Sequence, residues 1–169
     1  DLRELLEKES VREIGHQAVW SVSSCKQGYG VNSLRDNSLD TYWQSDGTQP
    51  HMVNVQFKQK TTMHSIGVYT DYKSDESYTP SRLSISVGND FNDLTEVEQV
   101  ELSEPSGWIW IKLPNQAGDK PIRTFMAQIS VLQVGLYVIG RDTHMRQIKV
   151  FASTEDATSV DFSSYLAVW

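Results

Sequence analysis

The sequence predicts an all-β fold: an antiparallel β-sandwich or jelly roll with a short N-terminal helix. From residue 51 onward, apolar and polar residues alternate with the period of two that half-buried strands show. Each alternating run is short and is bounded by Gly, Pro, Asn, Asp or Ser. No long helical segment separates the runs, so the crossover helices of a parallel sheet are missing. About eight short strands therefore indicate an antiparallel, two-layer arrangement.

The first fifty residues contain the predicted helix and little regular periodicity. Residues 2 to about 9 carry leucines at helical spacing with Glu and Lys between them, which indicates a short amphipathic helix. Residues 16–24, which include Trp20 and two valines, predict a strand. Residues 27–30 have the composition of a turn, and residues 31–36 could form one helical turn.

Five later runs each predict a strand with one face in the core. Side chains at alternate positions share a face, so each run assigns its apolar set to the interior. The residues assigned to the core are Val53, Val55 and Phe57; Leu83, Ile85 and Val87; Ile109, Ile111 and Leu113; Phe125, Ala127, Ile129 and Val131; and Ile148 and Val150.

The chain divides into three predicted parts: a helical extension at residues 1–10, a sandwich domain at 11–152 and a tail at 153–169. The tail begins with a polar stretch and ends in an apolar one. Such an apolar end could dock on another protein or fold back onto its own sandwich, and the sequence favours neither.

Composition limits the classes of partner. The formal net charge of −7 disfavours nucleic acid and anionic membranes, because both repel an acidic surface. No apolar run approaches 18 residues, so no membrane span is expected. The single cysteine, Cys25, excludes an internal disulfide and fits a reducing compartment. We expect a location in the nucleus and cytoplasm.

No motif predicts an enzyme, a metal site or a cofactor. The four histidines lack zinc-ligand spacing, and no nucleophile elbow, Walker loop or dinucleotide fingerprint occurs. Ser23-Ser-Cys-Lys26 matches a short hydrolase pattern without the partner motifs. The carboxylates of residues 71–79 could hold a cation, although their spacing fits no EF-hand.

Three polar, aromatic segments interrupt the predicted strands and are candidates for recognition. They are residues 40–47, 72–80 and 140–146. Loops of a sandwich cluster at its ends, and loops on a rigid β scaffold commonly carry binding sites. Their Tyr, Trp, Ser, Asp, Arg and His side chains suit peptide or ligand recognition.

These segments carry a resemblance to a known family. Residues 34–36, 40–45 and 51–57 resemble the galactose-binding-like jelly-roll superfamily. Longer strings resemble the DOC-domain subunits of the anaphase-promoting complex, or cyclosome, over about residues 11–151. They are Val11-Arg-Glu-Ile-Gly15, Ala18-Val-Trp-Ser-Val-Ser-Ser-Cys-Lys26, Thr41-Tyr-Trp-Gln-Ser-Asp-Gly47, Asp71-Tyr-Lys-Ser-Asp-Glu-Ser-Tyr-Thr-Pro80, Glu104-Pro-Ser-Gly-Trp108 and Gly140-Arg-Asp-Thr-His-Met-Arg-Gln-Ile-Lys149.

The resemblance implies a non-catalytic subunit of a RING ubiquitin ligase. Such subunits lie beside a WD40 coactivator and help to capture the destruction-box degron of cell-cycle substrates, which makes ubiquitin addition more processive. The implied peptide contacts are Ser77, Asp142 and His144, within a binding loop that also contains Gly140, Arg141 and Thr143.

Each implied contact has a structural alternative. Ser77 could cap a turn, Asp142 could bind local amides or pair with an arginine, and His144 could be a satisfied structural histidine. Trp43 is expected in the core. The residues expected to brace the loops are Asp40, Thr41, Trp43, Ser45, Asp75 and Glu76.

Two departures from the family pattern stand out. Ile139 replaces the Asn that usually precedes the binding loop, within a stretch that is also longer and more apolar than in the family. The family's terminal Ile-Arg, which docks on a tetratricopeptide-repeat scaffold subunit, corresponds here to Val168-Trp169, with Tyr165 as a further candidate. The altered end also allows a DOC module cut from a larger HECT or cullin-type ligase. The jelly roll alone would allow a carbohydrate or metabolite binder.

Overall fold

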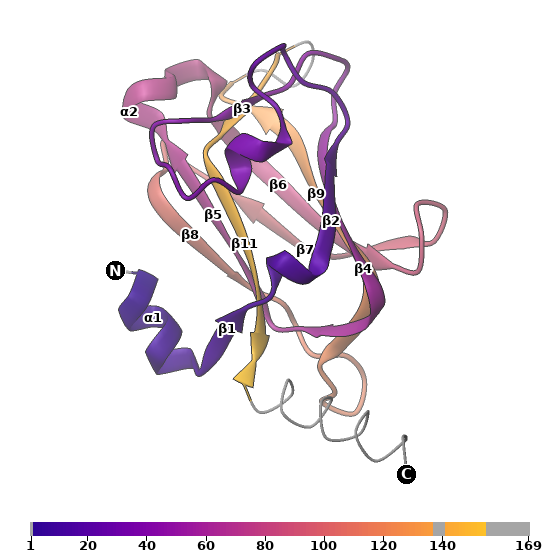
Figure 1. Ribbon diagram of the computed structural model, residues 1–169. Helices are drawn as coiled ribbons and strands as arrows, with labels where there is room; N and C mark the ends of the chain where they lie inside the picture. Colours follow the sequence, from indigo (N-terminus) through magenta and orange to yellow (C-terminus); the bar gives the residue numbers. More distant parts are fainter. Residues whose placement is uncertain (1, 137–140, 155–169) are drawn as a thin grey trace.

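A computed structural model describes residues 2–136 and 141–154 of the protein. In this part of the chain two antiparallel sheets pack face to face (Figure 1). One sheet has the strand order β1-β11-β5-β8 and the other β2-β4-β9-β6-β7. The predicted antiparallel β-sandwich with a short N-terminal helix is confirmed.

The elements lie within the following bounds. The first sheet contains β1 (Val11–Glu13), β5 (Ser65–Asp71), β8 (Ser106–Lys112) and β11 (Gln147–Ser153). The second contains β2 (Ala18–Val22), β4 (His51–Met63), β6 (Pro80–Gly88), β7 (Leu94–Glu101) and β9 (Ile122–Val134). A short pair of strands, β3 (Trp43–Gln44) and β10 (His144–Met145), joins two loops. The helical elements are α1 (Leu2–Glu9), α2 (Tyr72–Asp75) and the 3-10 turns η1 (Gly15–Gln17), η2 (Val31–Leu34) and η3 (Glu76–Tyr78).

The core lies between the sheets and contains most of the predicted inward residues. Valine, isoleucine and leucine side chains from β4, β6, β9, β5 and β11 fill it, and Ile109 is only partly buried. Phe125 is an error of the prediction, because it is 37% exposed while its neighbour Met126 is 1% exposed. The β4–β9 register shifts between Gln56 and Thr61, and such an irregularity reverses which side chains face the core.

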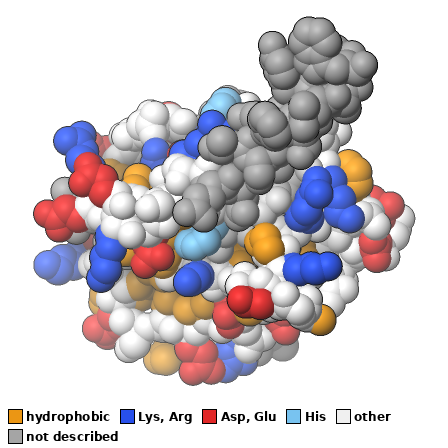
Figure 2. All heavy atoms as spheres, turned by 90° about the horizontal axis from the view of Figure 1, so that it is seen from below, with side chains coloured by type: hydrophobic (Ala, Val, Ile, Leu, Met, Phe, Trp, Pro, Cys, Tyr) orange, Lys and Arg blue, Asp and Glu red, His pale blue; other side chains and the backbone are white. Residues whose placement is uncertain are grey.

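The two ends of the sandwich differ. The loops that contain β3, α2 and β10 gather at one end, here called the loop end (Figure 1). At the other end, β1 pairs with the last residues of β11, and the amide of Thr154 donates to the carbonyl of Ser10 over 2.9 Å. Figure 2 views the molecule from this base and shows Lys, Arg, Asp and Glu side chains intermixed around its rim.

Tyr165, Val168 and Trp169, the predicted docking residues, lie outside the described residues. Within the described ranges, no helix has the length and apolarity needed to span a bilayer.

Candidate functional site

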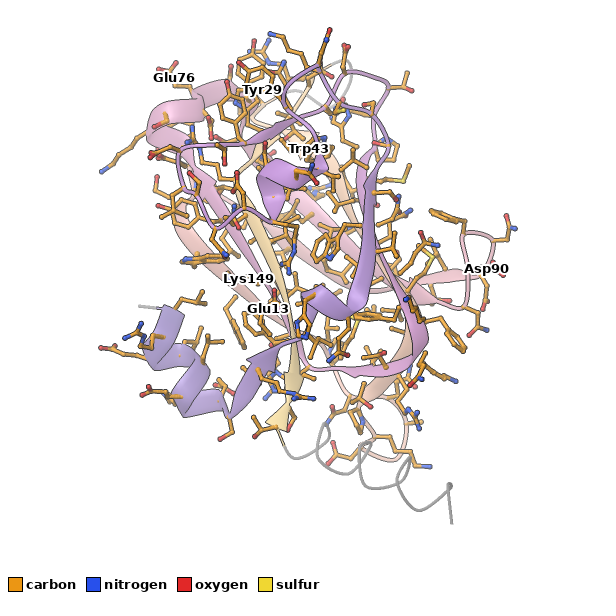
Figure 3. The ribbon with its side chains drawn as sticks, in the orientation of Figure 1. Glu13, Tyr29, Trp43, Glu76, Asp90 and Lys149 are labelled. Carbon is orange, nitrogen blue, oxygen red and sulfur yellow. The ribbon has the colours of Figure 1, made fainter. Side chains whose placement is uncertain are left out.

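The three polar segments meet at the loop end, around the β3–β10 pair. Residues of the 40–47 loop pair with His144 and Met145, and Asp75 of α2 reaches the same cluster. Tyr29 and Glu76 both lie at this end in Figure 3. A sandwich brings loops from distant parts of the sequence together in this way because its connections lie at its ends.

A buried acid holds the centre of the site. Asp75 is 5% exposed and accepts two hydrogen bonds from Arg146, from Nε over 2.9 Å and from Nη2 over 2.8 Å. The Nδ1 atom of His144 lies 3.1 Å from the same carboxylate. Arg146 also donates to the carbonyl of Leu39 over 2.8 Å, which ties the preceding loop to the cluster.

These contacts determine the charge states at the centre. Burial raises the pKa of Asp75, but the hydrogen bonds from His144 and Arg146 outweigh burial and hold that pKa below its usual value. The hydrogen bonds to Asp75 raise the pKa of Arg146 further. Asp75 and Arg146 therefore form a charged pair inside the protein, where each charge depends on the other for compensation.

An aromatic column surrounds His144. Its ring stacks on Tyr42 at 4.2 Å and on Tyr78 at 4.5 Å between centroids, and Tyr29 stacks on the far side of Tyr42 at 5.0 Å. Its Nε2 atom lies 3.0 Å from the side-chain oxygen of Gln44. Both ring nitrogens and both ring faces of His144 are therefore occupied by the protein itself.

A cation closes each end of this column. Arg141 lies 4.5 Å above the ring of Tyr78, and Lys26 lies 5.4 Å from the ring of Tyr29. Such cation–π contacts orient the basic side chain over the ring. The Nη2 atom of Arg141 also donates to Oγ of Ser77, so Ser77 and Arg141 form one polar unit beside Tyr78.

Ser45 joins the first loop to the third. Its hydroxyl accepts from the amide of Thr143 over 2.9 Å and donates to Oδ1 of Asp142 over 3.3 Å. The amide of Gly47 also donates to that oxygen over 3.3 Å. His51, which is fully buried, donates from Nε2 to the carbonyl of Arg141 over 2.6 Å. The backbone of residues 141–143 is thus fixed by Ser45 of the 40–47 loop and by His51 of β4.

The predicted peptide contacts fall into two groups. Ser77, Arg141 and Asp142 are partly exposed at the loop end, and Asp142 accepts from the amide of Gly47, which lies 95 positions away in the sequence. His144 is 8% exposed and Thr143 is fully buried, so both shape the loop from within. Direct peptide contact by these two residues does not fit their burial. Gly140 lies outside the described residues.

The predicted bracing residues also differ among themselves. Trp43 is fully buried and donates from Nε1 to the carbonyl of Ser24 over 2.9 Å. Thr41 donates to Asp36 over 2.6 Å, whereas Asp40 is exposed and only its amide is held, by Ser38. Glu76 is also exposed.

Several residues of the site were not singled out from the sequence. Tyr42 and Tyr78 lie inside two of the three predicted segments, so the signal was present, but the pairing of these rings across His144 was not visible. The others are Tyr29, Gln44, His51 and Arg146.

The polar groups of the site are mostly engaged with one another. Among the described residues, no three His, Cys, Asp or Glu side chains gather as a metal site, and Asp75 of the acidic segment is taken by Arg146. Ser23 and Ser24 use their hydroxyls to accept backbone amides. The partly exposed side chains of Arg141, Asp142 and Ser77, here called the peptide rim, offer a guanidinium, a carboxylate and a hydroxyl on a rigid frame.

Solved structures with a similar fold include carbohydrate-binding modules. The family 32 module of Clostridium perfringens NanJ, in complex with galactose, matches with a TM-score of 0.67 at 18% identity, over 84% of this chain and 99% of that one. A chitosan-binding module from Paenibacillus matches with a TM-score of 0.62 at 17% identity, over 83% and 99% of the two chains. At this identity the likeness shows the galactose-binding-like β-sandwich fold and no shared ligand.

Relatives of known name are much closer in sequence. Anaphase-promoting complex subunit 10 of Mus musculus is 53% identical, over 99% of this chain and 94% of the relative. The Drosophila melanogaster subunit is 58% identical over 86% and 73% of the two chains, and that of Schizosaccharomyces pombe 37% identical over 92% and 82%. The family model for anaphase-promoting complex subunit 10 matches residues 3–166. The chain therefore belongs to the family of anaphase-promoting complex subunit 10.

Proposed function

We propose that this protein is a non-catalytic subunit of the anaphase-promoting complex that binds the destruction-box degron of cell-cycle substrates together with the WD40 coactivator. Its contribution is to hold the substrate through successive ubiquitin transfers. It joins the complex in the nucleus and cytoplasm, through scaffold subunits that include a tetratricopeptide-repeat protein. Membership of the subunit 10 family carries the assignment to the complex.

The loop end supports the peptide-binding part of the proposal. Ser77, Arg141 and Asp142 present a hydroxyl, a guanidinium and a carboxylate within one partly exposed rim. An extended peptide offers main-chain donors and acceptors that such groups can bind. His144 acts as a positioning residue, because its stacked ring and its hydrogen bond to Asp75 fix the segment that carries Arg141 and Asp142.

Pre-organisation is the physical advantage of this rim. The Ser45 and His51 hydrogen bonds fix the 141–143 backbone before a ligand arrives. A fixed loop loses less conformational entropy on binding, so a few polar contacts can contribute measurable affinity. This suits a subunit that shares a short degron with a second receptor, because two linked weak contacts give a slow overall release.

A DOC module within a larger HECT or cullin-type ligase is the alternative. The relatives above, which align over 73–94% of their length, are named as subunits and favour the first reading. The full open reading frame separates the two, since a ligase domain encoded with this chain would establish the alternative.

The test is a reconstituted ubiquitination reaction with the complete complex, its coactivator and a destruction-box substrate. Ser77→Ala combined with Asp142→Asn should reduce the number of ubiquitins added per binding event. Asp90→Asn is the matched control, because Asp90 is an exposed aspartate between β6 and β7, away from the loop end (Figure 3), and the charge change is the same. Unchanged processivity in the double variant, after its incorporation into the complex is verified, would refute the site.

A further inference from the structure

A groove lies beside the proposed degron site and shares Ser77 with it. Its volume is about 610 Å³, within the range of sites that hold a ligand. The walls come from η3, the start of β6, the β7–β8 connection and residues 133–136. Leu102, Pro105 and Leu136 give it an apolar lining, and Leu136 is 94% exposed. The groove therefore adjoins the loop-end surface at Ser77.

The groove is acidic. Glu76, Glu101 and Glu104 line it against one cation, Arg82, which gives the lining a net charge of −2. Arg82 is already engaged by Glu101, with 2.9 Å between Nη2 and the carboxylate. No ion pair within the described residues joins Glu76 or Glu104 to a cation. A segment with Lys or Arg side chains would complement this surface, whereas an acidic one would be repelled.

A buried donor in the groove wall has no partner. Thr79 lines the groove and is 2% exposed, and its hydroxyl makes no hydrogen bond among the described residues. Because the hydroxyl oxygen is itself buried, a ligand in the groove does not reach it, and its missing hydrogen bond only lowers the stability of the wall. Nε of Arg82, in the same wall, is also buried without a partner.

Backbone conformation does not explain why glutamate occupies positions 76 and 104. Glu76 and Glu104 have positive φ angles of 49° and 44°, a region that favours Gly or Asn. Gly135 on the facing wall has φ 54°, and a Cβ there would lie 3.0 Å from the carbonyl oxygen of Ser77. The wall thus has glycine where close approach requires it and glutamate where the conformation alone would favour a smaller residue.

We propose that this groove binds an extended basic segment, with Lys or Arg facing Glu76 and Glu104 and an aliphatic side chain on Leu102 and Pro105. The inference rests on the proposed function for the origin of the segment, which is the part of a substrate that adjoins its degron. The groove itself is defined by its charge and shape.

The direct test measures binding of fluorescent peptides to the full chain by anisotropy. The probe has Lys-Ser-Leu-Ser repeats over about ten residues, roughly 30 Å when extended. Matched probes replace Lys by Glu or by Ser. The Lys probe should bind best and weaken with salt, and Glu76→Gln with Glu104→Gln should reduce its affinity roughly threefold to tenfold. Glu7→Gln with Glu4→Gln on α1 is the charge-matched control, at the other end of the sandwich.

Thr79→Val is a control within the groove wall. The variant removes the unpaired buried hydroxyl at nearly constant volume, so thermal stability should be unchanged or higher and affinity for the Lys probe should stay at the wild-type value. Equal binding of the Lys and Glu probes, or wild-type affinity in the double glutamine variant, would overturn the proposal.

The two proposals can fail separately. The probe contains no destruction box, so its binding does not depend on Asp142. If Ser77→Ala with Asp142→Asn leaves processivity intact but the glutamine variant no longer binds the basic probe, the degron site is refuted and the groove proposal is supported. If the Ser77 and Asp142 substitutions reduce processivity but the glutamine variant binds the basic probe as the wild type does, only the groove proposal is refuted.

Discussion

Nδ1 of His144 lies 3.1 Å from Oδ1 of Asp75, and the two residues come from segments 69 positions apart in the sequence. The same carboxylate binds Arg146 through two nitrogens. One buried acid thus links the α2 segment to β10 and to the residue that follows it. The geometry of the candidate peptide rim depends on that link, because Arg141 and Asp142 immediately precede β10.

Asp75→Asn should lower the free energy of unfolding by about 3–5 kcal/mol, because it leaves the Arg146 charge buried without compensation. Urea denaturation measures this. Asp90→Asn is the control, since the exposed Asp90 side chain accepts from the amide of Asn92, as Asn can also do, and its effect should stay within about 0.5 kcal/mol. Equal effects of the two substitutions would show that the buried pair is not a centre of stability.

The stability of the protein should also depend on Asp75 in acid. The pKa of Asp75 is lower in the folded state, so its contribution is complete above the ordinary pKa of about 3.9 and is lost as pH falls through the folded value. The gap in unfolding free energy between wild type and Asp75→Asn should therefore narrow as pH falls from about 7 to about 3. A gap that stays constant would contradict the lowered pKa.

Ser45→Ala should cost about 1–3 kcal/mol, because the buried amide of Thr143 loses its acceptor. The variant should also weaken degron-dependent ubiquitination, since Asp142 loses a contact with the first loop. Ser74→Ala at an exposed position provides the matched control. A fully stable Ser45→Ala protein would mean that the loops are fixed without this hydroxyl.

The bulge in the β4–β9 pairing can be tested with two adjacent substitutions. Met126→Ser should cost about 2–5 kcal/mol, because it opens a cavity and buries a hydroxyl. Phe125→Ser should cost less than about 1 kcal/mol, since Phe125 is partly exposed. The reverse order of stability would restore the simple alternation predicted from the sequence.

The predicted strands could be recognised because each has one face in the core and the other face exposed to solvent. β6 and β9 alternate in sequence because they pack one face on the core. β5 was not recognised, because the residues from Ser65 to Val68 are all buried and no period of two survives. β7 was missed for the opposite reason: it is an edge strand whose three glutamates resemble a solvated loop.

The site was predictable as a set of segments and not as a set of contacts. Polarity and aromatic content located the three loops that the fold brings together. The partners of His144 could not be inferred, because Gln44 and Asp75 lie 100 and 69 positions away in the chain. Burial of Thr143 and His144 is likewise a tertiary property, so residues matched to a binding motif became its internal supports.

The pairing of β1 with the last residues of β11 has a practical consequence for experiments. Residues 2–13 and 150–154 share one edge at the base, opposite the rim and the groove. A fluorophore or surface linker attached to α1 would point away from both candidate sites. Immobilised in this orientation, the protein would present its loops to solution, so that sensor-based kinetics with peptides would be free of steric interference from the attachment.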